Sequence, residues 1–284
     1  MNQLIQTLVR KLSRLKTNRS ALLDPNLTVK IDSKVIDNLR ALGSRRAPGI
    51  TKAGRLSLRG RCNNSEVKVY STFSTTQVQL RAYIQGLNFK GVAFPPLIMH
   101  SDSLVVEEWV EGRSLTHLRH SERAEVINRV GSFLAELKTH SEVSLPNAQL
   151  EQGFCYFNNY LLPRIEPWTF IDQVSSFLEC WQAEYRKVSS QIPMFISHPD
   201  LSLRNLVMDN EGKIFIVDNE LLGFGHGWIL DGRNSVLAND EKDFLTKEQL
   251  FLDHFIALSW RLRLLGTLLD AGRLDRISTI LDSA

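Results

Sequence analysis

Residues 195–222 of this chain read FISHPDLSLRNLVMDNEGKIFIVDNELL. Two short apolar runs in this stretch, LVM and KIFIV, flank the turn DNEG at residues 209–212. Turns of Asn, Asp and Gly between apolar runs are typical of a β-hairpin. We therefore predict two antiparallel strands, which bring Asn205, before the first strand, close to Asp218, after the second.

Four polar residues in the stretch follow the pattern H-x-D-x4-N-x12-D: His198, Asp200, Asn205 and Asp218. An Asn amide oxygen and an Asp carboxylate are hard ligands of the kind that Mg²⁺ prefers, together with phosphates and water. A neighbouring carboxylate can accept the proton of an attacking hydroxyl group. Phosphoryl transfer requires mainly such positioning and charge stabilisation. A solvated acidic loop is the alternative, but it does not account for four residues at fixed spacing beside a hairpin.

The stretch resembles the catalytic loop and metal-binding segment of the protein-kinase-like fold. Protein kinases carry H-R-D-x-x-x-x-N followed by D-F-G. Aminoglycoside phosphotransferases and choline kinases carry H-G-D-L-x-x-x-N followed by I-D-W/F-E, and here the second segment is IVDNE at residues 216–220. The resemblance implies an α+β, two-lobed fold with a β-rich N-lobe and a mostly helical C-lobe. It also implies that Asp200 is the catalytic base and that Asn205 and Asp218 are the metal ligands.

The chain after Asp218 distinguishes the branches of this superfamily. A protein kinase carries an activation segment that includes A-P-E, and no such segment follows here. Asp231 lies only 13 positions after Asp218, as in the small-molecule branch, where the corresponding Asp braces the catalytic loop. Pro199 also replaces the arginine that receives an activation-loop phosphate. The sequence therefore favours a small-molecule kinase.

The region from residue 28 to residue 110 is predicted to be β-rich with one helix, and it includes a hairpin around Asn63-Asn64. Lys68 lies in a segment, VKVY, that resembles the strand bearing the family's phosphate-binding lysine. A lone lysine on a strand can also simply face solvent. The segment EWVEG resembles the hinge of the aminoglycoside phosphotransferases. There the adenine hydrogen-bonds to backbone groups, which correspond to the Glu108 carbonyl and the Val110 amide.

Two features of a kinase-like N-lobe are weak in this sequence. No G-x-G-x-x-G precedes Lys68, and the glycines between residues 41 and 62 are scattered. The glutamate that pairs with the lysine is also missing, because residues 71–106 contain no Glu. Gln77 and Gln79 are the candidate substitutes, although a neutral hydrogen bond is weaker than a charge-assisted one.

The second half of the chain is predicted to be mostly helical. One helix is expected at residues 121–140, and another begins at Pro167. The apolar stripe of this second helix, from Phe170 to Trp181, is expected to face the core. One or two apolar helices around residues 251–269 close the lobe.

The first 19 residues contain five basic residues and no acidic one, with apolar residues at helical spacing. Such a helix either packs on its own domain, which is the preferred interpretation, or lies on an anionic membrane surface. We assign residues 1–27 to this helix, 28–111 to a nucleotide-binding N-lobe, and 112–284 to a catalytic and acceptor-binding C-lobe.

Composition agrees with a globular protein that has a large core. The chain has 284 residues, of which 43% are hydrophobic and 23% are charged. Its formal net charge of +3 gives no argument for a nucleic-acid partner. Cys62, Cys155 and Cys180 are widely spaced and form neither a disulfide framework nor a zinc site. A cytoplasmic location is expected, and no run of about 18 apolar residues predicts a membrane span.

The sequence thus predicts a kinase that uses ATP and Mg²⁺ to phosphorylate a hydroxyl group of a small molecule or a glycan. In this interpretation Lys68 contacts the α- and β-phosphates. Glu220, Asp231 and Asp240 are candidates for an acidic acceptor pocket, unless they are solvated surface acids. Two alternatives stay open. One is a pseudokinase that binds nucleotide or acts as a scaffold, which the missing glutamate supports, and the other is a protein kinase.

Overall fold

The computed structural model describes residues 27–44, 47–48, 56–87, 89–144, 156–191, 195–199, 201, 203–225 and 253–281. The basic stretch at residues 1–19, the candidate base Asp200, and Asp231 and Asp240 lie outside these ranges. Within the described residues, no helix is long and apolar enough to cross a membrane.

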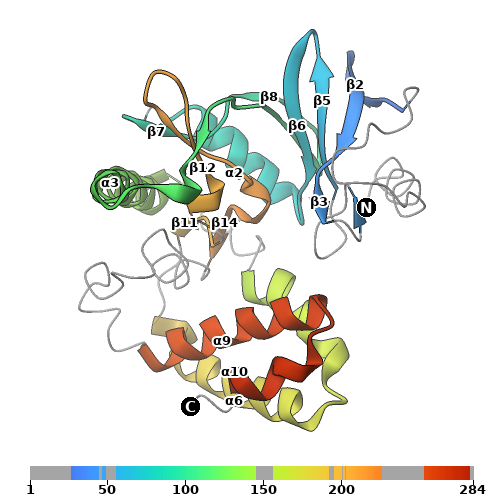
Figure 1. Cartoon of the computed structure of the whole chain (residues 1–284), viewed down its shortest axis with the longest axis vertical. Helices are drawn as coiled ribbons and strands as arrows, with labels where there is room; N and C mark the ends of the chain where they lie inside the picture. Colours follow the sequence, from blue (N-terminus) through green and yellow to red (C-terminus); the bar gives the residue numbers. More distant parts are fainter. Residues whose placement is uncertain are drawn as a thin grey trace. The chain divides into compact units, whose positions relative to one another are not determined.

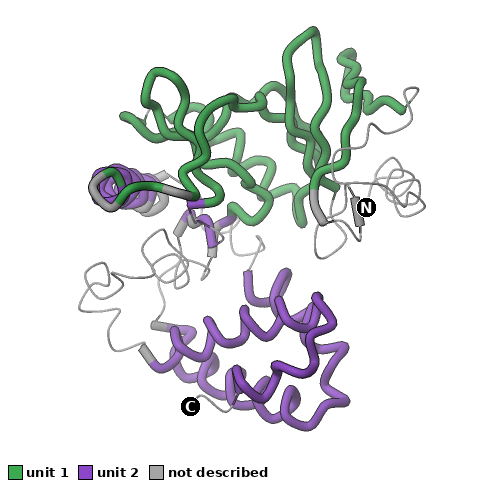
Figure 2. The backbone as a smooth tube through the Cα atoms, viewed as in Figure 1, with its two compact units in different colours: residues 1–122, 204–222 green, residues 123–203, 223–284 purple. Residues whose placement is uncertain are grey.

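The chain forms two compact units (Figure 2). Unit 1 consists of residues 1–122 and 204–222, and unit 2 consists of residues 123–203 and 223–284. The hairpin within residues 204–222 therefore packs in the same unit as the N-terminal strands. These units follow the packing of the backbone, and the boundary between lobes at residues 111 and 112 stays a prediction.

Unit 1 is built on a six-stranded antiparallel sheet with the strand order β1-β2-β5-β6-β9-β8 (Figure 1). The hairpin predicted around Asn63-Asn64 is confirmed, since β5 and β6 pair on either side of this turn. Both Asn residues have positive φ values, 49° and 68°, which Asn tolerates in two-residue hairpin turns. The strands are β1 (Val29–Ile31), β2 (Lys34–Ala41), β5 (Ser57–Cys62), β6 (Ser65–Ser71), β8 (Leu97–His100) and β9 (Leu104–Glu108).

The two faces of β6 meet different partners. Val67 and Val69 belong to a large apolar cluster with residues of β1, β2, β5 and β9. Tyr70 instead packs with Val78 of helix α2 (Thr75–Gln85). Because successive side chains of a strand point to opposite faces, Lys68 lies on the same face as Tyr70. The lysine is therefore on the helix-covered side of the sheet and is not solvent-facing.

A second sheet of unit 1 carries the predicted hairpin. Its strand order is β10-β12-β13-β7, and β12 pairs antiparallel with β13, as predicted. The Asp209 carboxylate accepts hydrogen bonds of 2.9 Å from the backbone amides of Glu211 and Lys213, which fixes the turn as Asp side chains often do. The strands are β7 (Val92–Ala93), β10 (Arg113–Ser114), β12 (Leu206–Met208) and β13 (Ile214–Ile216).

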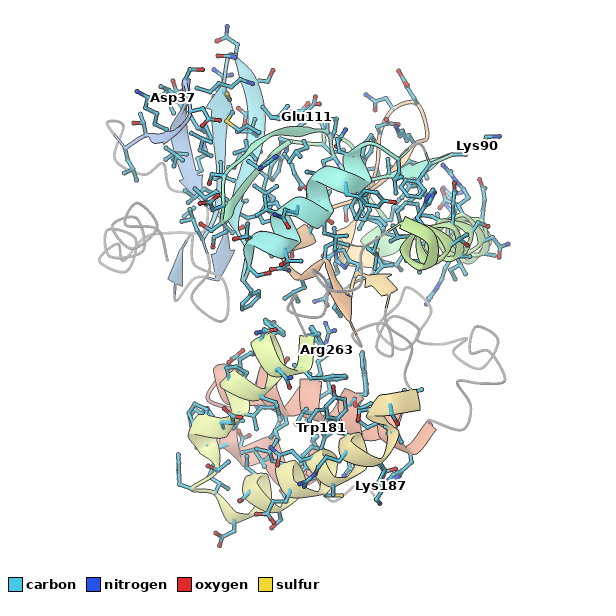
Figure 3. The ribbon with its side chains drawn as sticks, turned by 180° about the vertical axis from the view of Figure 1, so that it is seen from behind. Asp37, Lys90, Glu111, Trp181, Lys187 and Arg263 are labelled. Atoms are coloured by element: carbon cyan, nitrogen blue, oxygen red, sulfur yellow. The ribbon has the colours of Figure 1, made fainter. Side chains whose placement is uncertain are left out.

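Unit 2 is mostly helical in its described part. Phe157, Trp181, Tyr185 and Phe255 form an aromatic core with ring centroids 5.1–5.8 Å apart. Trp181 lies among these helices (Figure 3), and its indole N–H donates to the Ser259 hydroxyl at 2.9 Å. The helices include α3 (His120–Ser144), η3 (Tyr156–Leu161), α5 (Leu162–Ile165), α6 (Asp172–Val188), α9 (Asp253–Asp270) and α10 (Ile277–Leu281).

The predicted apolar stripe is correct from Val174 to Trp181 and wrong at its start. Helix α6 begins at Asp172, and Phe170 is 75% exposed beside Trp168. The residues before the helix form short turns, so they do not follow its periodicity. The fold class itself is confirmed: an α+β protein with a β-rich N-terminal part and a mostly helical C-terminal part.

Candidate functional site

A cavity of about 270 Å³ lies within unit 1. Its apolar walls are formed by Leu42, Val207 and Val217, and Glu107 of strand β9 also lines it. The cavity is also lined by every predicted nucleotide-binding or metal-binding residue that the structure describes: Lys68, Glu108, Val110, Asn205 and Asp218.

The hairpin brings Asn205 and Asp218 together, as its geometry predicts. Leu206 pairs with Ile216, and the amide of Val217 donates to the Asn205 carbonyl at 2.8 Å. Asp218 then adopts a left-handed backbone conformation, with φ 68° and ψ 48°, which is uncommon for a residue other than glycine. Asn205 is largely buried, whereas the Asp218 side chain is 48% exposed.

The hinge segment is held on both sides by backbone hydrogen bonds. The Glu108 amide donates to the Pro96 carbonyl at 2.8 Å, and the Trp109 amide donates to the Glu66 carbonyl at 2.9 Å. Gly112, the last residue of the hinge segment EWVEG, lies directly against the Met208 backbone, where an added Cβ atom would collide. The hinge segment therefore packs against strand β12 of the hairpin at a position that only glycine fits.

Lys68 is buried between two carboxylates. Its Nζ atom lies 2.7 Å from Asp218 Oδ1 and 2.9 Å from Glu220 Oε1. Burial by itself lowers the pKa of the Lys68 amine, but the charges of Asp218 and Glu220 outweigh it and hold the pKa above its usual value. The ammonium is therefore fully charged at neutral pH.

Neither candidate glutamine replaces the missing glutamate. Gln79 is exposed. Gln77 is buried, but its amide nitrogen donates to the carbonyls of Glu220 at 3.2 Å and Leu222 at 2.7 Å, and its amide oxygen accepts from the Phe73 amide at 2.8 Å. Gln77 thus anchors the segment after Asp218, and this segment supplies the Glu220 carboxylate to Lys68.

Glu220 is neither a solvated acid nor a free acidic group for an acceptor pocket. It is 3% exposed, and one carboxylate oxygen both contacts Lys68 and accepts a hydrogen bond from the Ser57 hydroxyl at 3.1 Å. Sequence reasoning missed this role, because it depends on the fold of the segment after Asp218. Glu220 lies two positions after Asp218, and the short helical turn η7 (Asn219–Leu221) folds it back toward β6.

A second buried acid, Glu107, was also missed. It is the cross-strand neighbour of Lys68 and is 1% exposed. Its carboxylate accepts from Arg81 Nε at 2.6 Å, from the Tyr70 hydroxyl at 3.0 Å and from the Asn219 amide at 3.2 Å. Burial, and then the Glu107 charge, raise the pKa of Tyr70 well above its usual value. Helix α2 therefore contributes a cation, Arg81, that pairs with the cavity-lining carboxylate of Glu107.

Asp200, the candidate base, lies outside the described residues. Its neighbours belong to unit 2: His198 is buried, and the Pro199 carbonyl accepts from Arg263 of helix α9 at 2.7 Å. The Leu201 amide donates to the His198 carbonyl at 2.9 Å. These contacts fix the loop on either side of Asp200 within unit 2, and the position of the base itself stays a prediction.

Comparisons with known proteins agree with this architecture. The model of a phosphotransferase enzyme family, APH, matches residues 90–228, just under half of the chain. The matched range includes the hinge, Asn205 and Asp218, and excludes Lys68. A search of curated proteins finds no significant match.

Solved structures with the same fold include a choline kinase and aminoglycoside phosphotransferases. The choline kinase LicA, in complex with AMP, is 14% identical, with 89% of this chain and 94% of that chain covered and a TM-score of 0.52. A mutant of aminoglycoside phosphotransferase APH(4)-Ia with AMP-PNP and hygromycin B is 13% identical, with coverages of 87% and 91% and a TM-score of 0.53. APH(2″)-IIa with streptomycin and ATP is 15% identical, with coverages of 87% and 92% and a TM-score of 0.54. The predicted resemblance to a kinase-like fold of this type is therefore confirmed.

Proposed function

We propose that this protein is a kinase that uses ATP and Mg²⁺ to phosphorylate a hydroxyl group of a small molecule or a glycan. One observation carries the proposal. Five residues that the sequence separately suggests as nucleotide or metal contacts line a single cavity. The family match and the nucleotide-bound structures of similar fold support the same conclusion.

The cavity suits a nucleotide with its base at the hinge. The adenine accepts from the Val110 amide and donates to the Glu108 carbonyl, while the apolar side chains of Leu42, Val207 and Val217 offer surfaces to its ring. Lys68, on the neighbouring strand, contacts the α- and β-phosphates. Its raised pKa supports this role, because the ammonium keeps its charge at neutral pH.

Asn205 and Asp218 fit a magnesium ion. No three His, Cys, Asp or Glu side chains form a metal cluster in the described part of the chain, but Mg²⁺ needs only a few protein oxygens when phosphates and water complete its shell. The amide oxygen of Asn205 and the half-exposed carboxylate of Asp218 are oxygens of the required kind. When bound, Mg²⁺ neutralises charge on the transferring phosphate.

Asp200 acts as the general base of the transfer. Its carboxylate orients the acceptor hydroxyl and takes its proton as the oxygen attacks the γ-phosphorus. The bond between the γ-phosphorus and the bridging oxygen breaks, and ADP leaves with that oxygen. The products are a phosphate ester of the acceptor and ADP.

A pseudokinase is the second candidate function. The absence of a glutamate on helix α2 favoured it at the sequence level, because Lys68 then had no charged partner. The Lys68–Glu220 contact of 2.9 Å weakens that argument. The absence of an activation segment after Asp218 argues against a protein kinase.

Incubation of the protein with γ-labelled ATP and Mg²⁺ tests the proposal. The acceptors are aminoglycosides, choline-type alcohols, glycans, glycolipids and unrelated proteins. We expect label in one hydroxyl-bearing small molecule or glycan, and none with Asp200→Ala. Binding of AMP-PNP without transfer to any acceptor would favour the pseudokinase, and label in a polypeptide would indicate a protein kinase.

A further inference from the structure

The two carboxylates on Lys68 differ sharply in how firmly they are held. The Glu220 side chain is 4% exposed, whereas the Asp218 side chain is 48% exposed. Both contact the same Nζ atom, at 2.9 Å and 2.7 Å. One partner of the lysine is therefore part of the protein interior, and the other is half-exposed and lines the cavity.

Glu220 is fixed by contacts to two other elements of unit 1. Ser57 of β5 donates its hydroxyl hydrogen to the carboxylate at 3.1 Å. Gln77 of helix α2 donates to the backbone carbonyl of Glu220 at 3.2 Å and to that of Leu222 at 2.7 Å. These bonds hold both the side chain and the backbone of Glu220, so the carboxylate cannot leave Lys68 without breaking its buried hydrogen bond to Ser57.

Asp218, in contrast, is also a candidate metal ligand. A carboxylate oxygen that binds a metal ion loses much of its attraction to an ammonium group. Asp218 therefore cannot bind Lys68 equally well with and without the metal ion. Helix α2 carries no Asp or Glu that could take its place. Lys68 therefore needs a second, permanent carboxylate if it is to stay directed at the phosphates.

We propose that Glu220 is the positioning residue of Lys68, and that Asp218 is an exchangeable partner that Lys68 gives up when nucleotide and metal bind. In this arrangement the carboxylate comes from the segment that follows Asp218. Gln77 of helix α2 holds that segment through hydrogen bonds to its backbone. This inference rests on the proposed function, since it assigns Lys68 to phosphate binding.

The isosteric variant Glu220→Gln tests the proposal through two measurements. The first is the rate at which an amine-reactive reagent modifies Lys68 without nucleotide or metal, measured by mass spectrometry. We expect this rate to be at least about threefold faster in Glu220→Gln than in wild type, because a charge-assisted contact is lost. We also expect the Mg²⁺ concentration for half-maximal AMP-PNP binding to rise by about tenfold, the size of one hydrogen bond to a charged group. The reason is that Lys68 then competes more strongly for Asp218.

Three further variants separate positioning from simple loss of structure. Glu220→Asp keeps the charge and should bring both measurements back toward the wild-type values. Ser57→Ala removes only the hydroxyl that holds Glu220 and should shift both measurements less, in the same direction. Glu211→Gln alters an exposed acid of the hairpin turn and should change neither.

The outcomes decide the proposal even if Glu220→Gln does not fold, because Ser57→Ala then carries the test. Unchanged Lys68 modification and an unchanged Mg²⁺ midpoint, both within about twofold, would overturn the positioning role. If wild-type protein binds no AMP-PNP, the proposed function fails, and the modification rate alone still decides whether Glu220 holds Lys68.

Discussion

Arg81 of helix α2 and Glu107 of strand β9 form a buried salt bridge, with 2.6 Å between Arg81 Nε and Glu107 Oε1. Their side chains are 2% and 1% exposed. Arg81 also donates to the Pro95 carbonyl, and Glu107 accepts from Tyr70 and Asn219. Helix α2 thus supplies the cation, and strand β9 supplies a carboxylate that also lines the cavity.

Substitution of Arg81 by Met should be strongly destabilising. It leaves Glu107 as a buried charge without its main partner, which typically costs about 3–5 kcal/mol. Urea denaturation of wild type and Arg81→Met measures this loss. The exposed pair Arg113–Glu122, at 3.2 Å, is the matched control, and Arg113→Met should change the denaturation midpoint little. Equal effects of the two substitutions would show that burial does not make the Arg81 contact important.

Lys68→Ala should lower kcat/KM for ATP by about a hundredfold, the usual scale for removing one charge-stabilising donor. Steady-state kinetics with the acceptor found by labelling measure this change. Lys90, an exposed lysine labelled in Figure 3, provides the control, and Lys90→Ala should retain wild-type turnover. Wild-type activity in Lys68→Ala would remove the lysine from phosphate binding.

The buried Tyr70 hydroxyl should make the free energy of unfolding fall at alkaline pH. Its folded-state pKa is raised, by burial first and by the Glu107 charge second, so the folded state holds the proton more tightly than the unfolded state. The resulting stability is present below the ordinary tyrosine pKa of about 10 and falls as the pH rises above it. Tyr70→Phe loses about 1 kcal/mol at neutral pH with its hydrogen bond to Glu107. Its urea stability curve should approach that of wild type above pH 10, and parallel curves would contradict the assignment.

The two glutamines of helix α2 should respond differently to the same substitution. Gln77→Glu removes the amide donor of the Glu220 and Leu222 carbonyls and should cost about 1–3 kcal/mol of unfolding free energy. Gln79→Glu changes an exposed position and should leave both stability and turnover near the wild-type values. A gain of turnover in Gln77→Glu would mean that this helix can still supply the carboxylate for Lys68.

The basic N-terminal stretch offers a prediction outside the described residues. If residues 1–19 lie on membranes, their deletion should abolish sedimentation with anionic liposomes and leave soluble-substrate turnover intact. Each basic residue near an anionic surface contributes roughly 1 kcal/mol, so added salt should release the wild-type protein. Wild-type protein that ignores anionic liposomes at low salt would leave the helix packed on its own domain.

The parts of the site that the sequence predicts are those fixed by local chemistry. The turn at residues 209–212 sets the β12–β13 hairpin, and this hairpin alone brings Asn205 near Asp218. The turn at Asn63-Asn64 likewise sets β5 and β6, which puts Lys68 on a central strand. In both cases a few adjacent residues determine the register, so a single sequence contains enough information.

The parts that the sequence does not reveal depend on contacts between distant segments. The carboxylate Asp218 that contacts Lys68 and the carbonyls that accept from the Gln77 amide lie more than 140 positions away. Arg81 of helix α2 and its partner Glu107 of strand β9 lie 26 positions apart, and Glu107 faces Lys68 only through the register between β6 and β9. No local pattern distinguishes a buried glutamate from a solvated one, and this is why Glu107 and Glu220 were missed. Phe170 shows the opposite error, because helical periodicity extended beyond the true start of α6 at Asp172.

The chain leaves unit 1 after residue 122 and returns to it at residue 204. As a result, every residue that lines the candidate nucleotide cavity belongs to unit 1, although these residues come from two separate segments of the chain. Under the proposed function, sequence drift within residues 123–203 and 223–284 would alter the choice of acceptor and leave the walls of the nucleotide cavity unchanged. In such a kinase, evolution or an engineer would exchange the acceptor while the phosphate donor stays the same.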